Sequence, residues 1–88
     1  MKKKGIDFSR LFDKDLKKAD IKIKKKFKER LKLFIVDEKD GLLKNHGLTG
    51  KWRGYRSINV TGDWRAIYVE ERERIIFVAL GTHSHLYG

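Results

Sequence analysis

The sequence predicts a single α+β domain over residues 1–88, with a short N-terminal strand and two helices ahead of a three-stranded antiparallel meander. Two observations indicate this class. In the first half, apolar residues recur every three or four positions, which is the period of a helix buried on one side. In the second half, three runs rich in β-branched and aromatic residues alternate with short polar turns. A chain of 88 residues has room for one modest core and not for a second domain.

The first expected elements are a short strand and a short helix. Residues 6–8 are apolar at both ends and can form a brief edge strand. A helix is expected over residues 9–17, because Leu11, Phe12 and Leu16 recur at helical spacing and would face inward. Both elements would therefore contribute to the core.

A longer helix is expected after Asp20, whose carboxylate can accept hydrogen bonds from the exposed amides of a first helical turn. Its apolar residues recur every four positions, at Ile23, Phe27, Leu31 and Ile35, with Phe34 alongside. Lysines cover the remaining face: Lys22, Lys24, Lys25, Lys26, Lys28 and Lys32. This face is predicted to lie in solvent, where it can also meet a nucleic acid or an acidic partner helix.

The second half begins with a loop over residues 37–50, where glycine, asparagine and aspartate interrupt the helical period. Three strands are then expected over residues 54–60, 64–70 and 74–80. The two helices are expected to pack on one face of this sheet. Because they cannot cover both faces, the other face is predicted to stay open as a contact surface.

The charge of the chain indicates a polyanionic partner. There are 22 Lys and Arg against 12 Asp and Glu, a net charge of +10. The absence of cysteine excludes disulfide frameworks, thiol catalysis and zinc ribbons. No apolar stretch has the length of a membrane span or a signal peptide, so the protein is predicted to be cytoplasmic, with no membrane partner.

Three motifs in the second half occur in a distinctive order. Residues 45–56 read Asn-His-Gly-Leu-Thr-Gly-Lys-Trp-Arg-Gly-Tyr-Arg, residues 62–68 read Gly-Asp-Trp-Arg-Ala-Ile-Tyr, and residues 81–87 read Gly-Thr-His-Ser-His-Leu-Tyr. Together they resemble the RelE/ParE toxin superfamily, and most closely its YafQ-like branch of bacterial type II toxin-antitoxin mRNA interferases. The order of the predicted elements is similar to that of the RelE-like fold.

The resemblance implies a toxin that cleaves messenger RNA in the ribosomal A site and that a cognate antitoxin holds inactive. It implies no metal and no small-molecule cofactor. Attack of a 2′-hydroxyl on the adjacent phosphate needs a base for that hydroxyl, hydrogen-bond donors for the phosphorane and an acid for the departing 5′ oxygen. The resemblance therefore implies an endoribonuclease with these groups in one cleft.

The resemblance also assigns candidate catalytic residues: His46, Asp63, Arg65, His83 and Tyr87. His83 is expected to be the general acid or base, with proton transfer assisted by Asp63 and His46. Arg65 is expected to stabilise the phosphorane, and Tyr87 to position a base or phosphate. Which residue is the general base stays open.

The same motifs offer candidate RNA-binding side chains: Lys51, Arg53, Arg56 and Asn59. One of them departs from the family pattern. Asn59 stands where YafQ-like toxins carry a histidine, and asparagine can donate a hydrogen bond but cannot titrate. Any proton transfer by that histidine in relatives would fall here to another residue of the site.

The turn between the first two meander strands allows two registers. A two-residue turn at residues 61–62 places Arg56, Asp63 and Arg65 on one face of the sheet. A three-residue turn instead sets Asn59 opposite Arg65. Either register leaves Arg65 near the turn, where it can hold a phosphate by two parallel hydrogen bonds.

His85 follows His83 by two residues, so an extended backbone would place both rings on one face and suggest a metal pair. Further ligands are not evident without cysteine, and His85 is predicted to be a bystander or an RNA contact. Four other aromatic residues are predicted to pack in the core or on the sheet: Trp52, Tyr55, Trp64 and Tyr68.

Two other functions fit the sequence. A ParE-like toxin on the same fold would poison DNA gyrase and cleave no RNA, because fold alone does not fix function. A non-catalytic RNA- or DNA-binding module would depend on the +10 charge alone, so its binding would collapse with salt and be indifferent to loss of His83.

Overall fold

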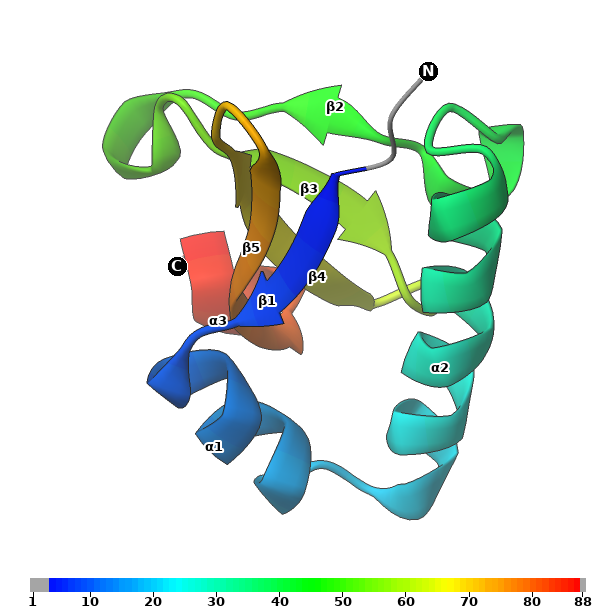
Figure 1. Cartoon of the computed structure of the whole chain (residues 1–88). Helices are drawn as coiled ribbons and strands as arrows, with labels where there is room; N and C mark the ends of the chain where they lie inside the picture. Colours follow the sequence, from blue (N-terminus) through cyan, green and yellow to red (C-terminus); the bar gives the residue numbers. More distant parts are fainter. Residues whose placement is uncertain (1–3, 88) are drawn as a thin grey trace.

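The computed structural model describes residues 4–87 and confirms the α+β class and the predicted order of elements (Figure 1). The elements are β1 (Gly5–Phe8), α1 (Arg10–Lys18), α2 (Ile21–Val36), the 3-10 turn η1 (Gly41–Leu43), β2 (His46–Gly47), the 3-10 turn η2 (Gly50–Trp52), β3 (Arg56–Asn59), β4 (Trp64–Glu70), β5 (Arg74–Thr82) and α3 (His83–Tyr87). Of the helices described, none is long and apolar enough to cross a bilayer.

The strands form one mixed sheet in the order β1-β5-β4-β3-β2. The predicted meander is its centre, because β3, β4 and β5 pair antiparallel in sequence order. The predicted edge strand is β1, which pairs parallel to β5. The sequence analysis missed β2, a strand of two residues that pairs with β3.

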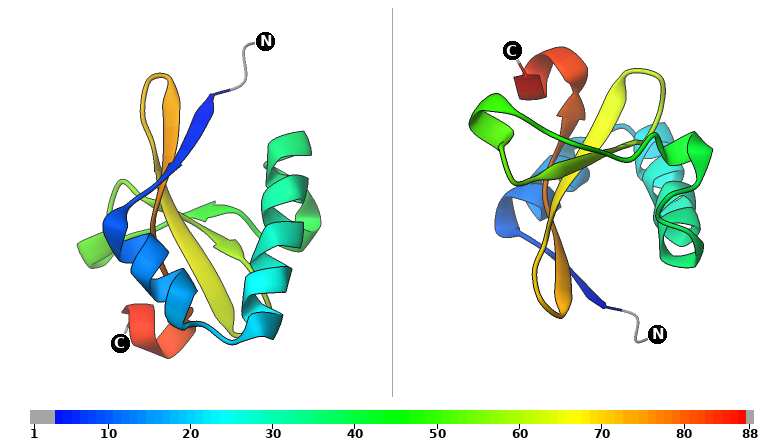
Figure 2. Two further views of the ribbon diagram at one scale, coloured as in Figure 1. Left: turned by 60° about the horizontal axis from the view of Figure 1, so that its bottom comes forward. Right: turned by 90° about the horizontal axis from the view of Figure 1, so that it is seen from above.

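Both predicted helix starts are confirmed by their caps. The Ser9 hydroxyl accepts from the Phe12 amide at 3.0 Å, and the Asp20 carboxylate accepts from the Lys22 amide at 2.8 Å. These side chains satisfy amides that the first helical turn leaves unpaired. The chain therefore turns sharply between α1 and α2, which lets both helices lie on the same side of the sheet (Figure 2).

The core between this helical layer and the sheet is aromatic. The ring of Phe77 on β5 lies 5.4 to 5.8 Å from the rings of Phe8, Phe12, Phe27 and Tyr68. Such stacked, tilted and edge-on ring contacts stabilise a core beyond the apolar area that they bury. The core thus fixes how α1 and α2 lie against β5.

Two apolar residues of the helices do not face this core as predicted. Leu11 is 55% exposed and Ile35 is 43% exposed, while Phe34, beside Ile35, is 3% exposed. Residues that follow one another on a helix point about 100° apart, so Phe12 and Phe34 take the inward direction that their neighbours then lose.

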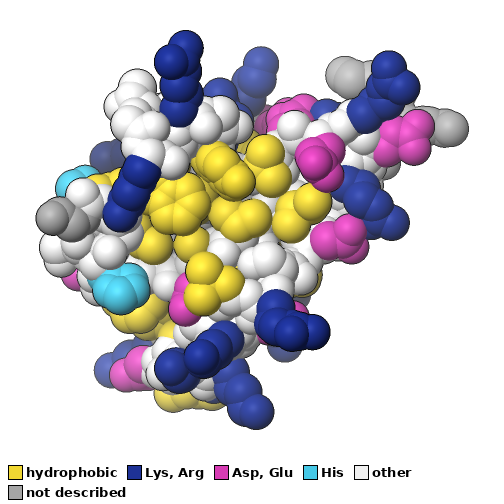
Figure 3. Space-filling model, turned by 90° about the vertical axis from the view of Figure 1, so that its left-hand side faces the viewer, with side chains coloured by type: hydrophobic (Ala, Val, Ile, Leu, Met, Phe, Trp, Pro, Cys, Tyr) yellow, Lys and Arg dark blue, Asp and Glu magenta, His cyan; other side chains and the backbone are white. Residues whose placement is uncertain are grey.

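The second face of the sheet is not left fully open. On this face Ile67 and Ala79 are buried beneath Leu86 of α3, and Trp52 packs against the same cluster. The expectation of an open face is therefore wrong for this part, because the chain after β5 folds back over it as α3 (Figure 2). Apolar side chains still gather in the middle of the side of the molecule drawn in Figure 3, with charged residues around them.

Candidate active site

An open cleft of about 920 Å³ lies where β2, the η2 segment, the β3–β4 hairpin and α3 meet. Its lining residues are Lys44, His46, Leu48, Thr49, Gly50, Lys51, Trp52, Asn59, Gly62, Arg65, His83 and Tyr87. The lining described here includes three cationic side chains, two histidines and no carboxylate. Such a lining favours a phosphate-bearing ligand.

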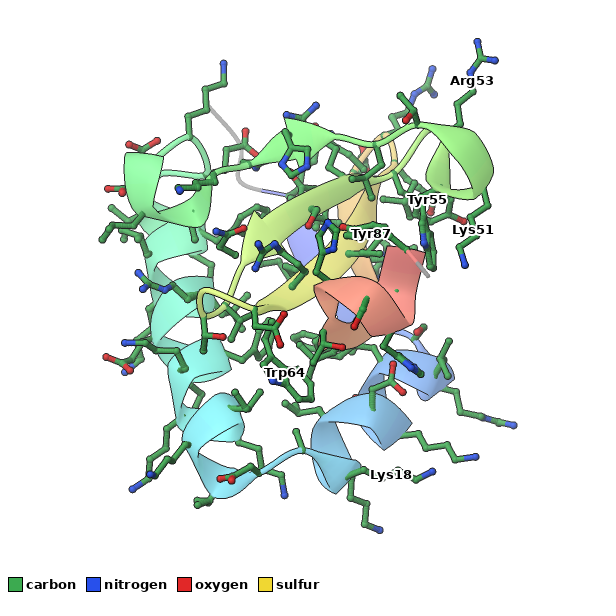
Figure 4. All side chains as sticks on the ribbon, turned by 180° about the vertical axis from the view of Figure 1, so that it is seen from behind. Lys18, Lys51, Arg53, Tyr55, Trp64 and Tyr87 are labelled. Carbon is green, nitrogen blue, oxygen red and sulfur yellow. The ribbon has the colours of Figure 1, made fainter. Side chains whose placement is uncertain are left out.

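The cleft brings together most of the residues that the sequence nominated. Four of the five catalytic candidates line it, namely His46, Arg65, His83 and Tyr87. Two of the four RNA-binding candidates, Lys51 and Asn59, line it as well. Asp63, Arg53 and Arg56 lie elsewhere, and Figure 4 shows Arg53 extending from the η2 segment away from the rest of the molecule.

The register of the β3–β4 hairpin decides which arginine reaches the cleft. Asn59 pairs with Arg65, and the Val60 amide donates to the Trp64 carbonyl oxygen at 2.9 Å, so the turn has three residues. Of the two registers considered above, the second is therefore correct. Arg56 pairs with Tyr68 and lies toward the helical layer, on the opposite face from Arg65.

Arg56 has a structural partner on that face. Its Nε donates to Oδ1 of Asn45 at 2.9 Å, and the side-chain amide of Asn45 donates to the Tyr68 hydroxyl at 2.8 Å. Arg56 therefore lies outside the cleft, and its contact to RNA stays a prediction. Lengthening the turn by one residue reverses the face of the sheet on which Arg56 lies relative to Arg65. The sequence alone does not decide the length of this turn.

Asp63 reaches the site through its backbone. Its carbonyl oxygen accepts from the His83 amide at 2.9 Å, and its own amide donates to the Thr61 hydroxyl at 3.3 Å. Its side chain is exposed and does not line the cleft. The structure thus ties the hairpin turn to the first residue of α3, and Asp63 as a proton carrier stays a prediction.

Arg65 is anchored to the same turn by one end of its guanidinium group. Nη1 donates to the carbonyl oxygens of Thr61, Gly62 and Trp64 at 3.1, 3.0 and 3.2 Å. Nε and Nη2 make no such contact to this turn, and together they carry three N–H donors. The anchored end fixes the plane of the group, and the other edge can bind a phosphate in bidentate fashion.

His46 has a defined tautomer when its ring is neutral. Nδ1 lies 2.8 Å from the carbonyl oxygen of Lys44. A carbonyl oxygen can only accept, so Nδ1 carries the proton and Nε2 keeps its lone pair. His46 can therefore accept a proton at Nε2.

His83 and Tyr87 lie one helical turn apart on α3, with ring centroids 4.7 Å apart in an edge-to-face arrangement. The Tyr87 hydroxyl is buried and has no hydrogen-bond partner among the residues described. An unpartnered polar group of this kind costs free energy unless a ligand or water satisfies it. Tyr87 thus lines the cleft with its ring, while its hydroxyl oxygen is closed off from solvent.

His85 points away from this cleft. The expected extended tail is wrong, because residues 83–87 form a helix, in which positions two apart lie on different sides. His85 lines a separate cavity of about 300 Å³ together with Asp15 and Trp64. Within residues 4–87, no group of three or more His, Cys, Asp or Glu side chains could hold a metal ion.

Trp52 is a lining residue that the sequence analysis treated only as a packing residue. Its Nε1 donates to the carbonyl oxygen of Leu86 at 3.0 Å, and its ring packs edge-on against Tyr55 at 5.5 Å. This contact joins the η2 segment to the end of α3. The spacing of apolar residues in the sequence does not indicate that Trp52 bonds to a residue 34 positions away.

We expect Trp52→Phe to lower both stability and activity. It keeps most of the apolar ring and removes the bond to Leu86, so the free energy of unfolding should fall by about 0.5 to 1.5 kcal/mol. The RNA cleavage that the resemblance implies should fall by about tenfold, because α3 would carry Tyr87 away from its place in the cleft. Urea unfolding and single-turnover cleavage measure the two effects, and an unchanged cleavage rate would contradict the positioning role.

Tyr68, buried on the helical side, has a pKa above its ordinary value, because burial disfavours the phenolate. The hydrogen bond from Asn45 and the charge of Arg56 oppose this effect without cancelling it. The unfolded chain therefore releases this proton at a lower pH than the folded protein does. The stabilisation is complete below about pH 10 and is lost as pH rises through the folded-state value.

Tyr68→Phe is expected to remove this part of the pH dependence. Below about pH 10 the variant should be less stable by about 0.5 to 1.5 kcal/mol, the contribution of one hydrogen bond. As pH rises further, the difference between wild type and variant should shrink. Urea unfolding between pH 8 and pH 11 measures it, and a constant difference would show that Tyr68 titrates alike in both states.

Comparison with known proteins identifies the family. A family model described as "Bacterial toxin of type II toxin-antitoxin system, YafQ" matches residues 4–88. The mRNA interferase toxin YafQ of Escherichia coli strain K12 is 34% identical over 92 residues, covering 100% of both chains.

Solved structures agree with this match. The crystal structure of YafQ from Escherichia coli BL21(DE3) has a TM-score of 0.81 at 31% identity and covers 98% of this chain and 100% of that one. The Escherichia coli DinJ-YafQ toxin-antitoxin complex gives 0.81 at 32% identity over 99% of this chain and 100% of that one. A YoeB/ParE toxin from Agrobacterium tumefaciens, at 19% identity, a TM-score of 0.72 and coverage of 90% and 98%, shares the fold. The predicted RelE-like fold and YafQ-like branch are thereby confirmed, and the chain belongs to the YafQ family of bacterial type II toxin-antitoxin toxins.

Proposed function

We propose that this toxin is a ribosome-dependent endoribonuclease that cleaves messenger RNA by attack of a 2′-hydroxyl on the adjacent phosphate. One observation carries the proposal: His46 and His83 line the same cationic cleft from two different elements, together with Arg65. Two histidines and an arginine supply the base, the acid and the charge that the reaction needs. The similarity to a protein named as an mRNA interferase supports the same reaction.

The proposed steps follow from the tautomer of His46. Nε2 of His46 takes the proton of the 2′-hydroxyl, whose oxygen attacks the phosphorus. Arg65 and Lys51 stabilise the negative charge on the phosphorane. His83, entering protonated, gives its proton to the 5′ oxygen as the P–O bond breaks, leaving a 2′,3′-cyclic phosphate and a free 5′-hydroxyl.

Tyr87 is proposed to hold the nucleotide at the cleavage point. Its ring lies beside His83, and aromatic stacking holds unpaired bases with little dependence on their identity. The ribosome would present the message in the extended form that the open cleft admits. A toxin of this kind acts in the cytoplasm and uses no small-molecule cofactor.

A cognate antitoxin is the second proposed partner. Escherichia coli YafQ has been crystallised with the antitoxin DinJ, and this chain is similar to that YafQ over its whole length. The net charge of +10 favours an antitoxin with acidic segments. Binding should suppress RNA cleavage by occupying or distorting the cleft.

Inducible expression followed by primer-extension mapping of cellular RNA tests the proposal. Cuts within translated codons, absent when translation is blocked and absent in His83→Ala, are expected. Growth arrest in which the DNA is damaged and the message stays intact would instead indicate a gyrase poison. Binding to RNA that collapses with salt and leaves message intact would indicate a non-catalytic module.

A further inference from the structure

Asn45, immediately before His46, is held by three different parts of the fold. Its amide nitrogen donates to the carbonyl oxygen of Glu38 at 3.0 Å and to the Tyr68 hydroxyl at 2.8 Å. Its oxygen accepts from Nε of Arg56 at 2.9 Å. The side chain thus joins the turn after α2 to β3 and β4, and none of these contacts belongs to the cleft.

We propose that Asn45 is a positioning residue that holds His46 in its proton-accepting orientation. This inference rests on the proposed function, since it assigns a role in that reaction. It concerns a residue that touches neither substrate nor the reacting atoms. Asn45 acts through the backbone of residues 44–46.

The need for such an anchor follows from how little else holds this segment. The strand β2 has two residues, and His46 and Gly47 are both exposed. Two backbone pairs with β3 do not by themselves fix a strand end. A ring on such a segment would turn and shift freely unless a neighbouring side chain were fixed.

The backbone conformation next to Asn45 sets the orientation of the His46 ring. Lys44 has a left-handed conformation, with φ of 46°, which a residue with a side chain seldom adopts. That conformation turns the Lys44 carbonyl oxygen to Nδ1 of His46 at 2.8 Å. Left-handed strain of this kind persists where the surroundings hold it, and the three bonds of Asn45 adjoin it directly.

The side chains of Asn45 and His46, which follow one another in the chain, lie on opposite sides of the sheet. Asn45 reaches the Arg56 and Tyr68 side of the sheet, and His46 reaches the cleft on the other side. This alternation is the ordinary one of an extended strand. Loss of the Asn45 contacts should therefore release His46 without altering any cleft residue chemically.

The test is Asn45→Ala, studied by two measurements. Single-turnover cleavage of ribosome-bound message should fall by about 10- to 100-fold with binding to the ribosome nearly unchanged, because a misplaced base costs rate more than affinity. Long-range ¹H–¹⁵N spectra at a pH where the ring is neutral should show His46 as the Nδ1–H tautomer in the wild type. In Asn45→Ala a mixture of tautomers is expected.

A matched control separates positioning from stability. Ser9→Ala removes the cap of α1 and should lower the midpoint of urea unfolding without touching the cleft. It should keep the wild-type cleavage rate and the Nδ1–H tautomer. If Asn45→Ala fails to fold, Asn45→Asp keeps the size and the acceptor for Arg56 while losing the Nδ2 donor to Glu38 and Tyr68, and it should give the same two changes more weakly.

Two results would overturn the inference: an unchanged His46 tautomer in the Asn45 variants, or a rate that falls only as much as in Ser9→Ala. The spectra do not depend on RNA cleavage. If the wild type cleaves no message but the Asn45 variants still change the tautomer of His46, the proposed function is overturned. The anchoring of His46 by Asn45 then still stands.

Discussion

Replacing His46 or His83 with alanine is expected to lower single-turnover cleavage of ribosome-bound message by about a hundredfold or more for each. The reason is that each removes one of the two cleft histidines that are proposed to transfer protons. The double variant should lose less than the product of the two single losses, because residues of one catalytic unit are not additive. Purified toxin, programmed ribosomes and a labelled message measure the rates.

His85→Ala provides the matched control for His83→Ala. Both residues are exposed on α3, but His85 lines the separate cavity beside Trp64 and not the cleft. The control should cleave at the wild-type rate with the same unfolding midpoint. Equal losses in the two variants would mean that α3 is needed only as a folded element, and a full rate in His46→Ala would remove His46 as the base.

The sequence was sufficient for features that depend on local pattern. The cap at Asp20, the two helices and the three meander strands are all written in adjacent residues, and the structure confirms them. Side-chain alternation then put Arg65 near the turn in either register. The motifs that carry the family resemblance, and not the local pattern, indicated the other cleft residues, His46, His83 and Tyr87.

Features that depend on distant contacts were out of reach. The predicted strand over residues 54–60 shortens to Arg56–Asn59, and the turn length that sends Arg56 away from the cleft is set by the sheet as a whole. The partners of Asn45 come from positions 7 to 23 residues away. No period in a single sequence reports such pairings.

The tail shows the same limit. A Cβ at Gly81 would lie 3.0 Å from the His85 ring and 3.3 Å from Leu86, so glycine there lets α3 fold back tightly onto β5. The sequence shows Gly81 ahead of His83 and His85, but it does not show the close approach of α3 that requires a glycine at this position. The helix in turn is why His83 pairs with Tyr87 and not with His85.

Arg65→Ala is expected to lower cleavage by about a hundredfold or more, a loss of roughly 2.7 kcal/mol of transition-state stabilisation. It should also loosen the hairpin turn, because Nη1 holds the carbonyl oxygens of Thr61 and Gly62 there. Single-turnover cleavage and urea unfolding measure the two losses. Arg72→Ala, an exposed arginine of the β4–β5 turn, is the control and should change neither.

Arg65→Lys separates the two tasks of the guanidinium group. A lysine ammonium can donate to the carbonyl oxygens of Thr61 and Gly62, so stability should return toward the wild type. It cannot at the same time present a second, coplanar pair of donors to a phosphate, so cleavage should stay close to that of Arg65→Ala. If the lysine variant regained the full rate, point charge alone would suffice at this position. If the lysine variant regained neither rate nor stability, the turn itself would need the planar guanidinium group. Binding of the phosphate would then have to be assigned to Lys44 or Lys51 at the same cleft.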